Sequence, residues 1–186
     1  MLGLIFIFLV IGIIFMIKGA RKFDKSIKQS KDTEAEFNNE LDKNNIIATQ
    51  KLFLNLNKKL YQMLVIDDVN KKLVYLTKTK NKKQPNLEPI NIQSFKYSDV
   101  LKCELISVSN YETKEANTLF SERKETRNIY YKQGFRIILN DLSNPFIEII
   151  YDDSIIATSV SYMQDIEEWM SKIDIVINKG KELKVN

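Results

Sequence analysis

Two pairs of adjacent aspartates come closest, in this sequence, to a metal or acid–base site: Asp67-Asp68 and Asp152-Asp153. Neighbouring residues in a strand point to opposite faces of a sheet, so such a pair rarely presents both carboxylates to one ion. Hard cations also need several converging oxygen ligands. Each pair follows an apolar run, at a place where aspartate favours turns. We therefore interpret both pairs as turn residues rather than as a metal site.

The composition removes most other catalytic chemistry. The 186 residues include no histidine and one cysteine, Cys103. Histidine-dependent catalysis and histidine-ligated metals are therefore excluded, and a single cysteine allows neither an internal disulfide nor a CxxC motif. The five glycines form neither a GxGxxG motif nor a P-loop. We expect a protein that is not an enzyme and has no cofactor, with a metal-dependent enzyme that uses carboxylates alone as the least favoured alternative.

The N-terminal segment is apolar. Residues 1–17 carry no charge and are apolar on every face of a helix, a pattern that suits lipid better than a protein core. As a helix they would span about 25 Å, near the short limit for a bilayer. A cleaved signal peptide would need a basic segment before the run and a cleavage site after it. We therefore expect residues 1–20 to form an uncleaved transmembrane anchor.

A basic block follows this segment. Between residues 18 and 31 the sequence has one acidic residue, Asp24, and six basic ones: Lys18, Arg21, Lys22, Lys25, Lys28 and Lys31. The positive-inside rule then predicts a single-pass protein of the cell membrane, with its N-terminus outside and its C-terminal domain in the cytosol. The whole chain has a net charge of +4, so 22 basic and 23 acidic residues remain after this block. A domain with this balance and few arginines is not expected to bind nucleic acid.

The rest of the chain divides into three parts. Residues 21–45 have a helix-forming composition and are predicted to be a basic juxtamembrane and helical connector. Residues 46–180 are predicted to form the folded domain, and residues 181–186 a tail. Within the domain, apolar runs predict strands that begin near residues 60, 72, 90, 100, 129 and 145.

Other segments of the domain are less regular. The polar turn 68–71 joins the first two of these strands as a hairpin, whereas residues 46–59 fit either a short helix or a strand. Cys103 alternates with charged neighbours and is expected to be a small core residue. We interpret the charged segment 110–128 as an insertion or a mobile loop.

The last element is predicted to be an amphipathic helix. Ser161 and Gln164 match a capping box, and Gly180 is the expected C-terminal cap. The apolar residues that recur at helical spacing are Tyr162, Ile166, Trp169, Ile173 and Ile177. A run of strands followed by one such helix predicts an α+β fold in which the helix covers an open side of a curled sheet.

The order of these segments resembles the bacterial pleckstrin-homology-like (bPH-type) domain proteins of Gram-positive bacteria and their prophages. The stretches that carry the resemblance are LVIDDVNKKLVYL, FKYSDVLKCELI, FRIILNDLSNPFIEIIY and YMQDIEEWMSKI. The resemblance implies a bent, seven-stranded antiparallel sheet capped by the C-terminal helix, and it implies no catalytic residue. In this chain the charged segment 110–128 stands where such domains usually have a glycine-rich insert.

These observations predict a membrane-anchored, non-enzymatic cytosolic module of the adaptor or immunity type. It would bind a protein partner through exposed loops or an open sheet edge. The alternative is a domain that senses anionic lipid, because a lysine-rich segment would be held near the bilayer by the anchor. A solvated loop is the simpler interpretation of that segment. The candidate lipid contacts are Lys18, Arg21, Lys22, Lys25, Lys78, Lys80, Lys82 and Lys83.

Overall fold

A computed structural model of the chain describes residue 24 and residues 27–56, 60–79, 88–118, 121–154 and 162–185. For residues 109–118, 121–131, 153–154 and 185 it describes the backbone alone. The chain divides into two units, Met1–Asn44 and Asn45–Asn186, and each is described by itself.

The first unit contains a helix over residues 27–43. It ends where the Asn44 side-chain amide donates a 2.8 Å hydrogen bond to the Glu40 carbonyl. Asn45 follows with a φ of 54°, a left-handed conformation that asparagine adopts more readily than most residues. This helix carries charged residues along its whole length.

The transmembrane part of the predicted fold class needs correction. In the described part of the chain, no helix is both long and apolar enough to cross a bilayer. The predicted anchor, residues 1–20, lies outside the described residues. The candidate lipid contacts Lys18, Arg21, Lys22 and Lys25 lie outside them as well.

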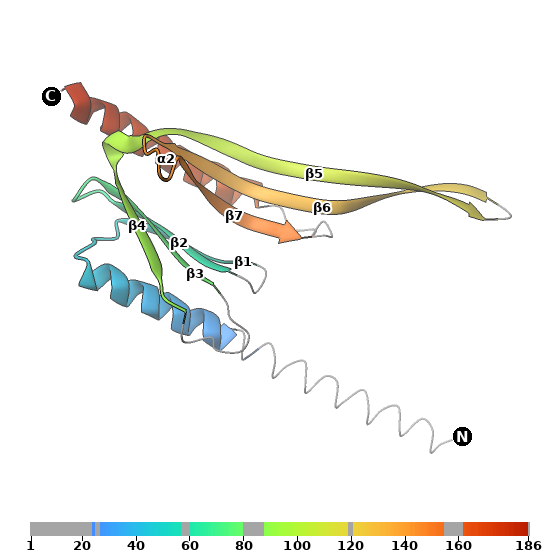
Figure 1. Ribbon diagram of the computed structural model, residues 1–186, viewed down its shortest axis with the longest axis horizontal. Helices are drawn as coiled ribbons and strands as arrows, with labels where there is room; N and C mark the ends of the chain where they lie inside the picture. The colour runs from blue at the N-terminus through green and yellow to red at the C-terminus, as the bar shows by residue number, and fades with distance from the viewer. Residues whose placement is uncertain are drawn as a thin grey trace, which may run out of the picture. The chain divides into compact units, whose positions relative to one another are not determined.

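In its described residues, the second unit has seven antiparallel strands and a C-terminal helix (Figure 1). One sheet has the order β1-β2-β3-β4, and the other has the order β5-β6-β7. The first four strands are β1 (Gln50–Leu56), β2 (Leu60–Asp67), β3 (Lys72–Thr79) and β4 (Asn91–Lys96). The remaining elements are a 3-10 turn, η1 (Tyr97–Asp99), then β5 (Val100–Thr118), β6 (Ser121–Leu139), β7 (Phe146–Ser154) and the helix α2 (Met163–Val185).

The prediction of one bent sheet is wrong, although the seven strands and the C-terminal helix are present. The chain changes sheets at η1, where the Tyr97 N–H donates to the Lys71 carbonyl at 2.9 Å. Beyond the turn, the Asn140 N–H donates to the Asp99 carbonyl at 2.8 Å, so that β5 starts beside β6 rather than beside β4. The undecided segment 46–59 provides β1, a strand paired with β2.

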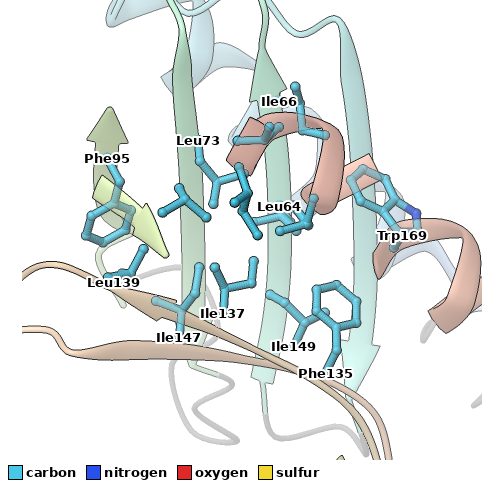
Figure 2. Close-up of a cluster of buried hydrophobic side chains, with 14 of the residues drawn as sticks. Leu64, Ile66, Leu73, Phe95, Phe135, Ile137, Leu139, Ile147, Ile149 and Trp169 are labelled. Atoms are coloured by element: carbon cyan, nitrogen blue, oxygen red, sulfur yellow. The ribbon is translucent and has the colours of Figure 1, made fainter. Parts of the chain in front are cut away.

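The two sheets and α2 share one hydrophobic core (Figure 2). Leu64 and Leu73 of the first sheet face Ile137 and Ile149 of the second. From α2, Ile166, Trp169, Ile173 and Ile177 are buried in the same cluster, so the predicted apolar stripe is confirmed. Burying each large apolar side chain contributes about 1.5–3 kcal/mol relative to leaving it exposed.

The predicted C-terminal cap at Gly180 is wrong, because α2 continues to Val185. The glycine serves close packing instead. A Cβ atom at this position would lie 2.2 Å from the Tyr97 carbonyl oxygen, so only glycine lets α2 approach η1 this closely. Ser161, the predicted start of the capping box, lies outside the described residues.

Of the two interpretations of residues 110–128, an insertion or a mobile loop, the mobile loop is wrong. β5 and β6 remain paired from residue 110 to residue 118, although β7 pairs with β6 only as far as Tyr131 opposite Ser154. Residues 110–118 and 121–130 therefore form a two-stranded extension, which we call the arm. Opposite charges occupy directly paired positions in it, such as Glu112 opposite Arg127. Such cross-strand pairs stabilise antiparallel strands by roughly 0.2–1 kcal/mol each.

Candidate functional site

The outer edge of β7 is closed by side chains of the other sheet. The Ile150 N–H donates to Gln62 Oε1 at 3.2 Å, and Gln62 Nε2 donates to the Glu148 carbonyl at 3.4 Å. Gln62 Nε2 also donates to Tyr75 Oη at 3.0 Å, and burial raises the pKa of Tyr75 to about 12. Gln62 is only 3% exposed, so its amide acts on β7 as a neighbouring strand would.

The outer edge of β5 is different. In the described part of the chain, β5 pairs with β6 alone. Three large apolar side chains on it are exposed: Leu101 at 46%, Leu105 at 46% and Val108 at 42%. Unpaired strand edges with exposed apolar residues are ready templates for pairing with another chain, and proteins usually protect them. We call residues 101–108 the β5 edge.

Cys103 lies within the β5 edge and packs against the core, which confirms its predicted role as a small core residue. It pairs in register with the buried Ile137. Burial, and secondarily the nearby Asp174 carboxylate, raises the pKa of the Cys103 thiol to about 12. A thiol with so high a pKa is protonated at neutral pH and therefore a poor nucleophile.

Lys102 and Glu104 flank this cysteine on the β5 edge. Lys102 Nζ lies 2.9 Å from Glu104 Oε1, and the two residues pair in register with Ile138 and Arg136 of β6. The hydrogen bond raises the pKa of Lys102 and lowers that of Glu104. Both side chains are well exposed, so this row of charges is open to solvent.

The charges near β7 are already paired with one another. Glu148 forms ion pairs with Lys132, at 2.6 Å, and with Arg136. Burial would raise the pKa of Glu148, but these two hydrogen-bonded cations hold it below its usual value. The Arg136 guanidinium also lies 4.7 Å from the centre of the Phe146 ring. The three charged side chains Lys132, Arg136 and Glu148 are therefore already paired with one another.

The predicted turn role of Asp67 is confirmed. Its carboxylate accepts hydrogen bonds from the Asn70 backbone N–H at 2.9 Å, the Asn70 side chain at 2.7 Å and the Ile47 N–H at 3.0 Å. Burial would raise the pKa of Asp67, but these hydrogen bonds lower it. Asp68 pairs instead with Lys179 and Lys71. The two carboxylates thus have separate partners, as the alternation of neighbouring residues predicts.

The predicted turn role of Asp152-Asp153 is wrong, because both residues lie within β7. Asp152 is buried opposite Gln133, and Asp153 is opposite Lys132 in the ladder. The strand runs further than its apolar pattern indicates, through a register shift between Gln133 and Gly134. Within the described ranges, no group of three or more His, Cys, Asp or Glu residues could hold a metal ion.

A pocket of about 190 Å³ lies between α2 and the ends of β1 and β2. Its lining includes the charged residues Asp68, Lys172 and Lys179. Lys179 is paired with Asp68, and Lys172 lies 2.6 Å from Glu168. The volume is below the range of about 300–1,000 Å³ that is typical of ligand pockets. The pocket therefore offers a ligand little space and charges that are already paired.

The four candidate lysines of the polar segment are not brought together by the described structure. Lys78 lies in β3 and is only 5% exposed. Lys80, Lys82 and Lys83 lie outside the described residues.

Sequence reasoning missed the β5 edge because alternation assigns Leu101, Cys103 and Leu105 to the core. The ladder with β6 shifts register between Val100 and Lys102, which leaves Leu101 without a directly paired residue. A signal was nevertheless present. Leu105, Ile106 and Val108 put apolar residues on both faces of one strand, as an edge that is covered on both faces requires.

Comparisons with known proteins give no relative: no protein-family model matches the chain, and no curated protein or solved structure matches it.

Proposed function

We propose that this protein is a non-enzymatic interaction module that binds an extended protein segment along the β5 edge. The observation that carries this proposal is the exposure of Leu101, Leu105 and Val108 on a strand that pairs on one side only. Strand addition of this kind gains affinity from main-chain hydrogen bonds and specificity from alternate side chains.

A comparison between the arm and the β5 edge supports this choice of binding site. It continues the same strand, yet its sequence is charged, with Glu112, Lys114 and Glu115 on β5. Charged residues are a common protection of strand edges against pairing with other chains. The β5 edge carries charges as well, Lys102 and Glu104, but it adds three exposed apolar side chains, Leu101, Leu105 and Val108. These exposed apolar side chains on an edge strand are best explained by a partner that covers them.

The energetic scale is that of a reversible interaction. Covering the exposed half of a leucine or valine side chain contributes about 1 kcal/mol. Three such side chains and a short ladder of main-chain hydrogen bonds, each worth about 0.5–1.5 kcal/mol net, must also offset the entropy of association. We therefore propose binding in the micromolar range, about −8 kcal/mol.

Two further features belong to this proposal. The resemblance to the pleckstrin-homology-like domains is supported by the order of seven strands and a C-terminal helix. A cytosolic setting is supported by the single free cysteine, Cys103. Binding along the β5 edge does not require a membrane anchor.

The test is a selection of peptides from a random twelve-residue display library on the full chain. Selected peptides should perturb the backbone amide NMR signals of the β5 edge, and Leu105→Lys should weaken their binding at least tenfold. N-methylation of alternate peptide amides should abolish binding, because strand addition depends on main-chain hydrogen bonds.

Leu142→Lys is the matched control, since Leu142 is fully exposed in the loop before β7 and should not affect binding. Peptides that perturb another surface, or that bind equally well after N-methylation, would refute strand addition on β5.

A further inference from the structure

The sequence of the β5 edge is complementary to itself. Around Cys103 it reads Leu101-Lys102-Cys103-Glu104-Leu105, with a leucine at each end and opposite charges next to the cysteine. We propose that the segment bound along this edge is the β5 edge of a second copy of the chain, in antiparallel pairing about a two-fold axis at Cys103. This inference rests on the proposed function and names its partner.

The pairing follows from the symmetry. When two identical antiparallel strands are related by a two-fold axis through one residue, positions at equal distances on either side lie opposite each other. With the axis at Cys103, Lys102 lies opposite Glu104 of the second copy, and Leu101 lies opposite Leu105 of the second copy. Each pair occurs twice. The dimer thus places opposite charges and apolar residues in directly paired positions, the arrangement that stabilises antiparallel ladders.

Neighbouring registers lose this match. An axis at Lys102 or at Glu104 places that residue opposite its own copy, which puts like charges in direct opposition. An axis at Leu101 places Lys102 opposite Val100 and Glu104 opposite Ser98, and an axis at Leu105 places Lys102 opposite Val108 and Glu104 opposite Ile106. Only the register centred on Cys103 satisfies both the charges and the apolar side chains.

The faces of the strand agree with this register. Cys103 and Leu105 pair in register with Ile137 and Phe135, which belong to the core. A two-fold axis perpendicular to the sheet keeps each face on its own side. Cys103 and Leu105 of both copies therefore lie on the core side of the sheet, and Lys102 and Glu104 of both copies lie on the other side.

The proposed pairing also stops at a dimer. Continued growth of the sheet would require the opposite edge of each copy, which is β7. At Glu148 and Ile150 that edge is closed by Gln62. Pairing through β5 is isologous, so it produces a closed dimer rather than an open filament.

The experiment is a charge swap on the full chain, followed by sedimentation velocity over a range of concentrations. The wild-type chain should dimerise. Lys102→Glu and Glu104→Lys should each raise the dimer dissociation constant at least tenfold, because each creates two like-charge oppositions. The double variant K102E/E104K should restore dimerisation, and an equimolar mixture of the two single variants should form mixed dimers.

The matched control is the charge reversal Glu40→Lys, which breaks a pair of comparable exposure with Lys43 on the N-terminal helix. It should leave the dimer unchanged. A wild-type chain that stays monomeric, or single variants that associate no better together than apart, would overturn the second-copy inference. If selected peptides still bind the β5 edge in that case, the proposed function stands. If they also fail to bind, both ideas fail.

Discussion

Lys179 Nζ lies 2.8 Å from each carboxylate oxygen of Asp68, a residue 111 positions earlier in the chain. The contact joins α2 to the turn between β2 and β3. Lys71 approaches the same carboxylate at 3.2 Å, and Tyr97 Oη donates to it at 3.4 Å. The Asp68 carboxylate therefore connects the turn between β2 and β3 with η1 and with α2.

We predict that Asp68→Asn lowers the free energy of unfolding by up to about 1 kcal/mol at pH 7, the upper range for a partly exposed ion pair. The Lys179 hydrogen bond, aided by Lys71, lowers the pKa of Asp68 below its usual 3.8. A lowered folded-state pKa contributes stability that is present above pH 3.8 and is lost as the pH falls through the folded value. Denaturant melts of both proteins between pH 2 and pH 7 measure this difference.

Lys179→Gln should show the same loss at pH 7, and 1 M salt should reduce both losses by screening. A difference between wild type and Asp68→Asn that persists unchanged at pH 2 would show that the ion pair is not the cause.

A second prediction concerns Gln62, whose amide closes the edge of β7. Gln62→Met keeps the approximate volume but leaves the Ile150 N–H without its partner, while the Glu148 carbonyl keeps the hydrogen bond from the Tyr75 hydroxyl at 3.4 Å. A buried group left unpaired costs about 1–3 kcal/mol, so we expect a loss of about 1–3 kcal/mol in denaturant unfolding. The Ile150 amide should also exchange its hydrogen faster than in the wild type, through local opening of the β7 edge rather than through global unfolding.

Gln50→Met is the control, because Gln50 is exposed on β1 and should change stability by less than about 0.5 kcal/mol. Equal effects of the two substitutions would contradict the role assigned to Gln62.

The elements were largely predictable from the sequence, and the pairing between them was not. The apolar stripe of α2 and the strands near residues 60, 72 and 100 follow from local periodicity. The assignment of β4 and β5 to different sheets depends on η1, whose N–H donates to Lys71 far earlier in the chain. Such a long-range hydrogen bond leaves no periodic trace in the sequence.

Register explains the errors in the arm and on the β5 edge. Residues 110–128 look like a solvated loop until Glu112 and Lys114 are placed opposite Arg127 and Glu125. The exposure of Leu101 and Leu105 likewise depends on the register shift after Val100 and on the position of β5 at the edge of its sheet. Alternation predicts which residues share a face, but it cannot tell an edge strand from a central one.

Cys103 provides a third prediction. Its pKa of about 12, against a usual 9.0, means about a thousandfold less thiolate in the folded protein at neutral pH. Alkylation by iodoacetamide at pH 7.5 should therefore be roughly a thousandfold slower than in the urea-unfolded chain. Above pH 9 the unfolded thiol ionises while the folded one does not, so stability should fall there. Mass spectrometry follows the modification, and rapid labelling of the folded chain would contradict the burial of the thiol.

The last prediction concerns Gly180, where α2 closely approaches η1. Replacing this glycine with alanine should destabilise the protein, although the same replacement usually stabilises a helix. In an exposed helix, replacing glycine with alanine stabilises by about 1 kcal/mol. At Gly180 the new Cβ would lie 2.2 Å from the Tyr97 carbonyl oxygen and 2.6 Å from its carbon, both backbone atoms that cannot rotate away. Gly180→Ala must therefore push α2 away from η1, and overpacking of this kind typically costs about 1–3 kcal/mol.

Asn178→Ala, two residues earlier on the exposed side of α2, separates this packing effect from helix propensity. It should raise the melting temperature slightly, because alanine is the better helix former. Gly180→Ala should lower the melting temperature and weaken the Asp68–Lys179 ion pair, since Lys179 moves with the helix. The loss of that pair would be visible as a smaller effect of Asp68→Asn in the Gly180→Ala background. Additive effects of the two substitutions would mean that α2 keeps its position and that the alanine is accommodated elsewhere.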